Sequence, residues 1–180
     1  DGRYSRQIYI GLGDDGRRRY KTVYGATQKE VDEKALEVKI QMRKGIDISA
    51  DHDTFEEWAK RWLKLKKGEV GEKQYRCYQT STSYLLERLQ FLPISKVRAC
   101  DIQEIIIDLA ENNPHTRKPS SKKVLMDLRM TANQIFRFAI SNRVMEYNPA
   151  STVFIPSDAP TKKRRALTDT EIQWIMETPH

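Results

Sequence analysis

Alternating apolar and polar residues open the chain and predict a β-hairpin. The segments Arg3–Ile10 and Arg17–Tyr24 are rich in β-forming residues, and they flank a turn rich in glycine and aspartate at 11–16. Because side chains alternate between the faces of a strand, we expect one apolar face made of Tyr4, Ile8, Ile10, Tyr20 and Tyr24. The opposite face would then carry Arg3, Ser5, Gln7, Tyr9, Arg19, Lys21 and Val23.

Apolar residues recur at helical spacing in the segments that follow. A capping box, Thr27 to Glu30, opens a helix that ends at Gly45 and can cover one face of the hairpin. A second capping box, Thr54 to Glu57, opens the first of four amphipathic helices with short connections, which predict one compact bundle. These helices are expected at 54–67, 72–89, 101–111 and 120–142. The longest should bury Val124, Leu128, Ala132, Ile135, Phe136, Ala139 and Ile140.

The chain changes character after the bundle. Pro156 and Pro160 flank a polar stretch that runs into a basic segment, as in an interdomain linker. A third capping box, Thr168 to Glu171, then begins a helix with one apolar face. Such a helix cannot bury that face alone, so we expect a further domain. The start at Asp1 likewise indicates part of a longer protein, with a preceding strand removed. The predicted fold is mainly α with a small α+β N-terminal module.

Composition excludes several classes of protein. The 180 residues carry a formal net charge of +7, and no apolar run is long enough for a membrane span or a signal peptide. Cys77 and Cys100 are too few for a disulfide scaffold, and the three histidines lie far apart, so we expect no metal. No glycine-rich phosphate loop or catalytic constellation is present, so we expect no cofactor and no enzyme activity from this chain alone.

Basic residues gather in separate segments. Residues 1–24 contain six Lys or Arg against three acids, while 113–124 and 159–167 contain four each and no acid. Duplex nucleic acid is the polyanion that best fits several such clusters, and we expect them to border one concavity wide enough for a duplex. A β-ribbon fits the major groove, and free amides at helix starts bind phosphates. The candidate DNA-binding residues are Arg3, Ser5, Gln7, Arg17, Arg18, Arg19, Lys21, Lys73, Gln74, Arg76, Arg117, Lys118, Ser120, Ser121, Lys122, Lys123, Lys162, Lys163, Arg164 and Arg165.

Other interpretations of the same residues stay open. Each basic cluster could be an ordinary solvated surface, and the chain could be a helical protein–protein adaptor or a DNA-binding regulator that is not a recombinase. An RNA-binding module would need exposed aromatic residues for stacking. The aromatic residues Trp58, Trp62, Tyr75 and Tyr78 fall instead on apolar faces, where core packing is expected.

Several stretches resemble one known family. Residues 2–27, followed by an acid-rich helix, resemble the arm-type DNA-binding domain of integrases from phages and integrative conjugative elements. Residues 54–157 resemble the core-binding domain of tyrosine recombinases. The motifs that carry this second resemblance are Thr54–Trp58, Leu92–Ile94 and Ala139–Ala150. The segment Arg165–Ile172 is similar to the start of that family's catalytic domain.

The resemblance implies an arm-type DNA-binding domain at 1–46, a four-helix, SAM-like core-binding domain at 53–157, and a basic linker with the start of a truncated catalytic domain at 158–180. It implies a parent recombinase that forms a covalent 3′-phosphotyrosine, with a nucleophile that is none of the eight tyrosines here. The implied partners are arm-type and core-type duplex sites, three further copies in a tetramer, and accessory DNA-bending proteins. The implied setting is the bacterial or phage-derived cytoplasm, at the nucleoid, during integration or excision of a mobile element.

Overall fold

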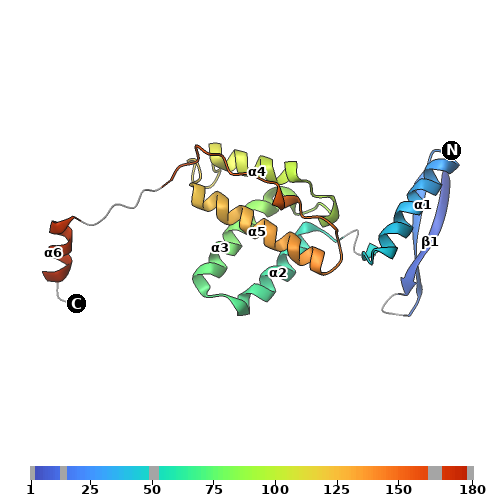
Figure 1. Ribbon diagram of the computed structural model, residues 1–180, viewed down its shortest axis with the longest axis horizontal. Helices are drawn as coiled ribbons and strands as arrows, with labels where there is room; N and C mark the ends of the chain where they lie inside the picture. Colours follow the sequence, from blue (N-terminus) through green and yellow to red (C-terminus); the bar gives the residue numbers. More distant parts are fainter. Residues whose placement is uncertain (1–2, 13–15, 49–52, 162–167, 178–180) are drawn as a thin grey trace.

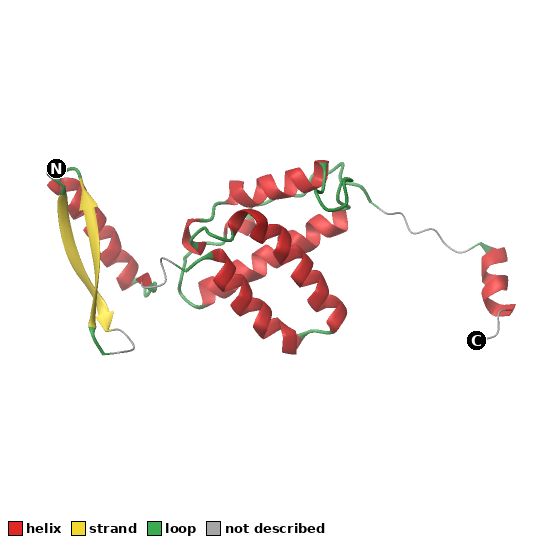
Figure 2. Ribbon diagram, turned by 180° about the vertical axis from the view of Figure 1, so that it is seen from behind, coloured by secondary structure: helices red, strands yellow, loops and turns green. Residues whose placement is uncertain are grey.

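The computed structural model describes residues 3–12, 16–48, 53–161 and 168–177. A two-stranded sheet with one helix precedes a bundle of four helices, and a further helix follows (Figure 1). The elements are β1 (Tyr4–Leu12), β2 (Arg18–Gly25), α1 (Gln28–Arg43), α2 (Phe55–Glu69), α3 (Glu72–Leu89), η2 (Ile94–Lys96), α4 (Ala99–Glu111), α5 (Lys122–Ser141), η3 (Pro149–Ser151) and α6 (Asp169–Glu177). Figure 2 shows strands only in the N-terminal module of the described chain. The predicted fold class is confirmed.

The register of β1 and β2 decides which side chains face α1. Ile8 lies opposite Lys21, and Val23 follows on the same face of the sheet. Ile8 and Val23 are buried, whereas Tyr20 and Tyr24 are 50% and 60% exposed. The predicted face of the second strand is therefore wrong by one residue. That strand carries apolar side chains on both faces, and the aliphatic one is buried while the tyrosines keep their hydroxyl groups near water.

A β-bulge shifts the pairing near the turn of the hairpin. Tyr9 pairs with Tyr20, but the next paired residue of β1 is Gly11, which lies opposite Arg19. Gly11 has a φ of 129°, a conformation that side-chain-bearing residues rarely adopt. Leu12 then lies opposite Arg18. The bulge thus lengthens one strand without changing the alternation along β2.

The helix α1 covers the sheet as its spacing predicts. Thr27 Oγ1 accepts a hydrogen bond from the Glu30 amide, while the Glu30 carboxylate accepts one from the amide of Ala26. The hydrogen bond from Lys34, with the Ala26 amide, lowers the pKa of Glu30. The residues that α1 buries are Val31, Ala35 and Val38. With Ile8 and Val23 they form the small core of the N-terminal module.

The helices α2 to α5 share one larger core. Its fully buried large side chains include Phe55, Leu85, Leu89, Ile102, Ile106, Leu128, Ile135 and Phe136. The capping box at the start of α2 is confirmed, because Thr54 and Glu57 exchange hydrogen bonds between side chain and backbone amide in both directions. Trp58, Trp62 and Tyr78 are buried, as predicted, while Tyr75 is half-buried.

The predicted α5 core differs from the structure at both ends of the helix, because Val124 is partly exposed and Ile140 is only half-buried. Leu125 is completely buried, whereas Val124 is 36% exposed. Leu125 precedes Leu128 by three residues and Ala132 by seven, so helical spacing keeps it on the inner face. Val124 lies about 100° further around the helix and reaches its edge. The other predicted positions from Leu128 to Ala139 are buried.

The helix α6 stands apart from the bundle, and none of its described residues is buried (Figure 1). Its capping box is confirmed by hydrogen bonds between Thr168 and Glu171. Trp174 and Met176 are 78% and 82% exposed. Within the described parts of the chain, no helix has both the length and the apolar character that crossing a membrane requires.

Candidate nucleic-acid interface

An open hollow of about 660 Å³ lies between the starts of α3 and α5. Because these two helices pack against each other, the hollow unites candidate residues that lie far apart in the sequence. The candidates that line it are Lys73, Gln74, Arg76 and Lys123. Its other lining residues are Gly71, Glu72, Cys77, Thr80 and Asp127. The hollow thus combines three cations, two carboxylates and several neutral hydrogen-bonding groups.

Two of the three cations of the hollow, Lys123 and Arg76, are paired with carboxylates of their own helices. Lys123 Nζ lies 2.7 and 2.9 Å from the two carboxylate oxygens of Asp127, and this hydrogen bond raises the pKa of Lys123. Arg76 pairs in the same way with Glu72. Both side chains stay open to solvent, with Lys123 79% and Arg76 74% exposed. The pair of Arg76 with Glu72 is exposed on both partners and such pairs are weak, so a phosphate group can replace Glu72. Asp127 is only 16% exposed, so its pair with Lys123 is partly buried.

The start of α5 already makes several contacts within the protein. The side chain of Ser120 is buried, and its Oγ accepts a hydrogen bond from Asn113 Nδ2 at 3.0 Å. The Lys122 amide donates to the carbonyl oxygen of Pro160 at 2.8 Å. The first amide of α5 is therefore already used within the protein, and the hydroxyl group of Ser120 is buried while its oxygen accepts from Asn113. Ser121 is the N-cap residue of α5, and its side chain makes no capping hydrogen bond.

Asn113 organises the neighbouring loop, and the sequence prediction missed it. Its side-chain nitrogen donates to Tyr84 Oη at 2.9 Å as well as to Ser120, and its oxygen accepts from the His115 amide at 3.0 Å. The side chain is 2% exposed. The candidates Arg117 and Lys118 lie on the loop that Asn113 holds, and both are exposed. The Asn-Pro dipeptide at 113–114 marks the start of this loop in the sequence, but it does not show that the Asn113 side chain is buried.

The open face of the sheet is the second candidate surface. By register and alternation it carries Ser5, Gln7, Tyr9, Arg18, Tyr20, Thr22 and Tyr24, with Arg3 next in line. The rings of Tyr9 and Tyr20 meet edge to face with their centres 5.7 Å apart. Apart from Arg18, the paired residues of this face are neutral. It offers hydroxyl groups, an amide and aromatic rings, which suit base edges better than phosphates.

Two predicted cations lie on the other side of the sheet. Arg19 and Lys21 alternate with Val23 and so point toward the side that α1 covers. Lys21 is only half-exposed, whereas Arg19 is exposed near the turn. Arg17 is also exposed and lies just before β2. The expected grouping of Arg19 and Lys21 with Ser5 and Gln7 on one face is therefore wrong. As with Val23, the register places these two side chains on the same face as Ile8.

The two surfaces lie at separate places on the molecule. Figure 1 shows the hairpin beyond one end of the bundle and the start of α5 near its opposite end. The hollow at α3 and α5 contains no residue of the hairpin. Among the described residues, the hairpin and the hollow therefore present separate surfaces, one on each module. The candidates Lys162, Lys163, Arg164 and Arg165 lie outside the described residues.

The titratable side chains of the described ranges do not gather into a metal site: no group of three His, Cys, Asp or Glu is close enough there to hold an ion. The thiol of Cys77 borders the hollow, and its burial, followed by the nearby Asp127 carboxylate, raises its pKa.

Comparisons with known proteins agree with the geometry of the bundle. The phage integrase central domain family matches residues 55–153. A solution structure of a fragment from Clostridium leptum is 34% identical, with a TM-score of 0.51, and covers 62% of this chain and 96% of its own. No match was found among curated proteins.

Two structures of lambda integrase share the fold at 16% identity and a TM-score of 0.56. One is a dimer bound to a COC′ core site, and the other is a tetramer bound to a Holliday junction. Each alignment covers 92% of this chain, which spans 49% and 51% of the two lambda integrase chains. Because the family match at 55–153 covers more than half of the sequence, the chain belongs to the phage integrase central domain family and is a member of the tyrosine recombinases.

Proposed function

We propose that the two modules of this recombinase bind duplex DNA, the N-terminal module at arm-type sites and the helical bundle at core-type sites. The observation that carries the proposal is the hollow where Lys73, Gln74 and Arg76 of α3 meet Lys123 of α5. These residues belong to two separate stretches of the sequence, and the packing of α3 against α5 brings them together. The proposed domains keep their boundaries at 1–46, 53–157 and 158–180.

The division of labour follows from the chemistry of each surface. Exposed cations at two helix starts suit phosphate oxygens on either side of a groove. The narrow sheet, with Gln7 and its neighbouring hydroxyl groups, suits the major groove. The DNA complexes of lambda integrase, which has the same fold, support a role of this bundle at a core site. Arg117 and Lys118 would contact the backbone beside the hollow, and the basic run 162–165 would follow it toward the next domain.

We further propose that strand cleavage takes place in a catalytic domain following Leu167, through a tyrosine that forms a 3′-phosphotyrosine. The residues described here then contribute affinity and site selection. A tetramer on DNA, accessory DNA-bending proteins, and integration or excision of a mobile element complete the proposed setting.

Fluorescence anisotropy with a short mixed-sequence duplex tests the central proposal. Replacing Lys73 and Lys123 with alanine should weaken binding by about tenfold or more and reduce the slope of log affinity against log salt by about two. The matched control is Lys60→Ala with Lys64→Ala on α2, since Lys60 pairs with Glu56 as Lys123 does with Asp127. The control should bind almost as the unaltered chain does.

For the unaltered chain, neutralisation of about six phosphates would lower affinity on the order of a thousandfold between about 50 and 200 mM salt. Binding that ignores salt over this range would contradict the proposal. Failure to bind any duplex would favour the adaptor interpretation, and preference for single-stranded RNA of equal length would favour an RNA-binding module.

A further inference from the structure

The end of α1 contacts the turn that follows α5. Lys44 Nζ lies 3.1 and 3.0 Å from the two carboxylate oxygens of Glu146, a residue 102 positions away. The amide of Asp47 donates a hydrogen bond to the carbonyl oxygen of Arg143 at 2.8 Å. These contacts join the N-terminal module to the bundle through both a side-chain pair and the backbone.

Two residues with left-handed backbone conformations meet at this contact. Gly45 ends α1 with a φ of 75°, and Arg143 follows α5 with a φ of 59°. A Cβ atom on Gly45 would lie 3.2 Å from Arg143 Nη1. Arginine adopts this conformation only at an energetic cost, so the surrounding contacts must hold it in place. The glycine leaves room for the guanidinium group that lies over it.

Each side of the contact is anchored in its own core. Ile48 is 7% exposed and packs with Ile8, Val23 and Val31 in the N-terminal module. Val144 and Met145 are 5% and 8% exposed and belong to the core of the bundle. A small hollow of about 240 Å³ separates parts of the two sides. Each contacting segment is therefore anchored in the core of its own module, and polar groups connect the two segments.

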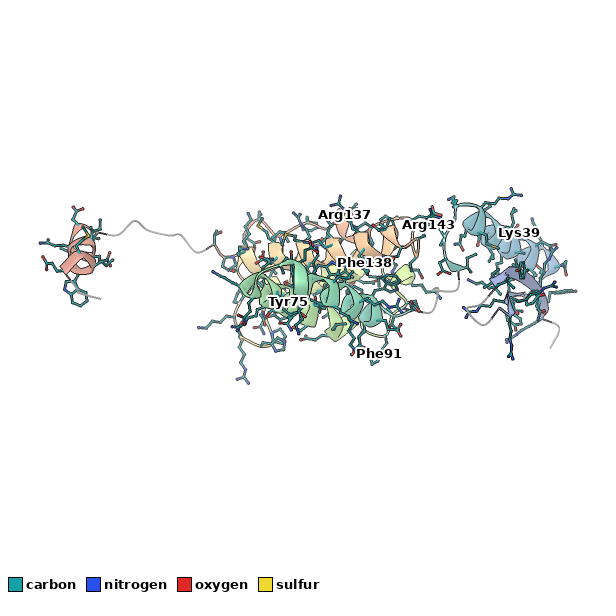
Figure 3. All side chains as sticks on the ribbon, turned by 90° about the horizontal axis from the view of Figure 1, so that it is seen from below. Lys39, Tyr75, Phe91, Arg137, Phe138 and Arg143 are labelled. Carbon is teal, nitrogen blue, oxygen red and sulfur yellow. The ribbon has the colours of Figure 1, made fainter. Side chains whose placement is uncertain are left out.

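We propose that Lys44–Ile48 and Arg143–Tyr147 form an intramolecular docking joint that holds the N-terminal module in one orientation on the bundle. Figure 3 shows Lys39 of α1 and Arg137 of α5 on the same side of the molecule, with Arg143 between them. The joint fixes this relation, and with it the direction of the open face of the sheet. The joint consists only of residues of this chain, so it is tested separately from DNA binding.

The glycine of the joint offers a sharp test. Gly45→Ala adds a methyl group against Arg143, whereas Gly16→Ala adds one at a similar φ of 72° with no atom within 4 Å. Both alanines carry the same left-handed strain, and only the first meets the other module. Amide hydrogen exchange of Asp47 should speed up several-fold in Gly45→Ala alone. Nitrogen-15 relaxation should give one rotational correlation time for both modules of the unaltered chain and two for Gly45→Ala. The amide of Val31 should stay protected in both variants if the N-terminal module remains folded.

Charge reversal provides the second test. Lys44→Glu and Glu146→Lys should each speed Asp47 exchange by about two- to fivefold, the range of an exposed ion pair, and the double reversal should restore it. Arg43→Glu is the matched control, because it changes the same charge in the last turn of α1 without touching Glu146. An unprotected Asp47 amide, or two correlation times in the unaltered chain, would overturn the joint. Equal effects of Lys44→Glu and Arg43→Glu, or of the two alanines, would also overturn it.

Discussion

The hollow of the bundle and the open face of the sheet differ in the groups they present. The hollow holds three cations and two carboxylates at helix starts, whereas the paired residues of the sheet face carry one cation, Arg18, among hydroxyl, amide and aromatic groups. Charged groups bind phosphates of any sequence, and that binding weakens with salt. Neutral donors, acceptors and rings gain most from base edges and thymine methyl groups. In the proposed function, the hollow would therefore supply most of the affinity for DNA, and the sheet face would supply most of the sequence preference.

Reversing charge in the hollow should have the largest effect. The double variant Lys73→Glu with Lys123→Glu should lower the affinity of the bundle for DNA on the order of a hundredfold at about 0.1 M salt, because two attractive contacts become repulsive. Selection from a random duplex library should still recover the sequences that the sheet prefers. An equal loss of both kinds of binding would break the distinction between the surfaces.

Asn113 sharpens the comparison, because the bundle surface depends on a buried amide and the sheet surface does not. Asn113→Ala leaves Tyr84 and Ser120 without a buried partner and should destabilise the bundle by about 1–3 kcal/mol. Thermal unfolding of the bundle measures the loss, and Asn112→Ala, at the exposed end of α4, is the control. Equal melting temperatures for the two variants would contradict the role of Asn113.

The tyrosines of the sheet should act on sequence preference. Replacing both Tyr9 and Tyr20 with alanine removes the edge-to-face pair and should lower affinity for a selected sequence by about tenfold. The dependence on salt should stay unchanged, since no charge is lost. Tyr4→Ala, on the other face at similar exposure, is the control. A parallel change in the salt slope would mean that the face binds through charge after all.

The smallest expected effect concerns acid stability of the N-terminal module. The pKa of Glu30 is lowered from 4.5 by its bonds to Lys34 and the Ala26 amide. A lowered folded-state pKa stabilises the module above the unfolded value, and this stabilisation is lost as the pH falls through the folded value. Amide signals of α1 followed in an acid titration should therefore weaken in that range. Glu30→Gln should remove the dependence, whereas Glu33→Gln should keep it.

The helices could be predicted because each repeats the same apolar spacing over several turns. The predicted core positions of α5 from Leu128 to Ala139 are all buried. Capping residues mark the starts of α1, α2 and α6. Val124 failed because its neighbour Leu125 is equally apolar and no earlier turn of the helix distinguishes them. The helical pattern thus loses certainty only at the two ends of the helix, at Val124 and Ile140.

The strand faces and the start of α5 could not be predicted in the same way. A strand of alternating side chains has only two faces, and β2 offers apolar residues on both, so burial of Val23 depends on how α1 packs. The sequence at the start of α5 is typical of an anion site. In the structure, however, the Ser120 oxygen accepts a hydrogen bond from Asn113, and the Lys122 amide donates one to the carbonyl oxygen of Pro160. These partners are distant in sequence, so only the folded chain reveals them.

The position of Cys77 makes the hollow observable without altering its charges. In a chain with Cys100→Ser, the Cys77 thiol is the single site for a fluorescent maleimide. Its raised pKa slows labelling at neutral pH, so alkaline buffer is the suitable condition. A ligand that fills the space between α3 and α5 would shield this sulfur and slow its labelling. Labelling rates measured with duplexes of decreasing length would therefore show how long a duplex must be to occupy the hollow.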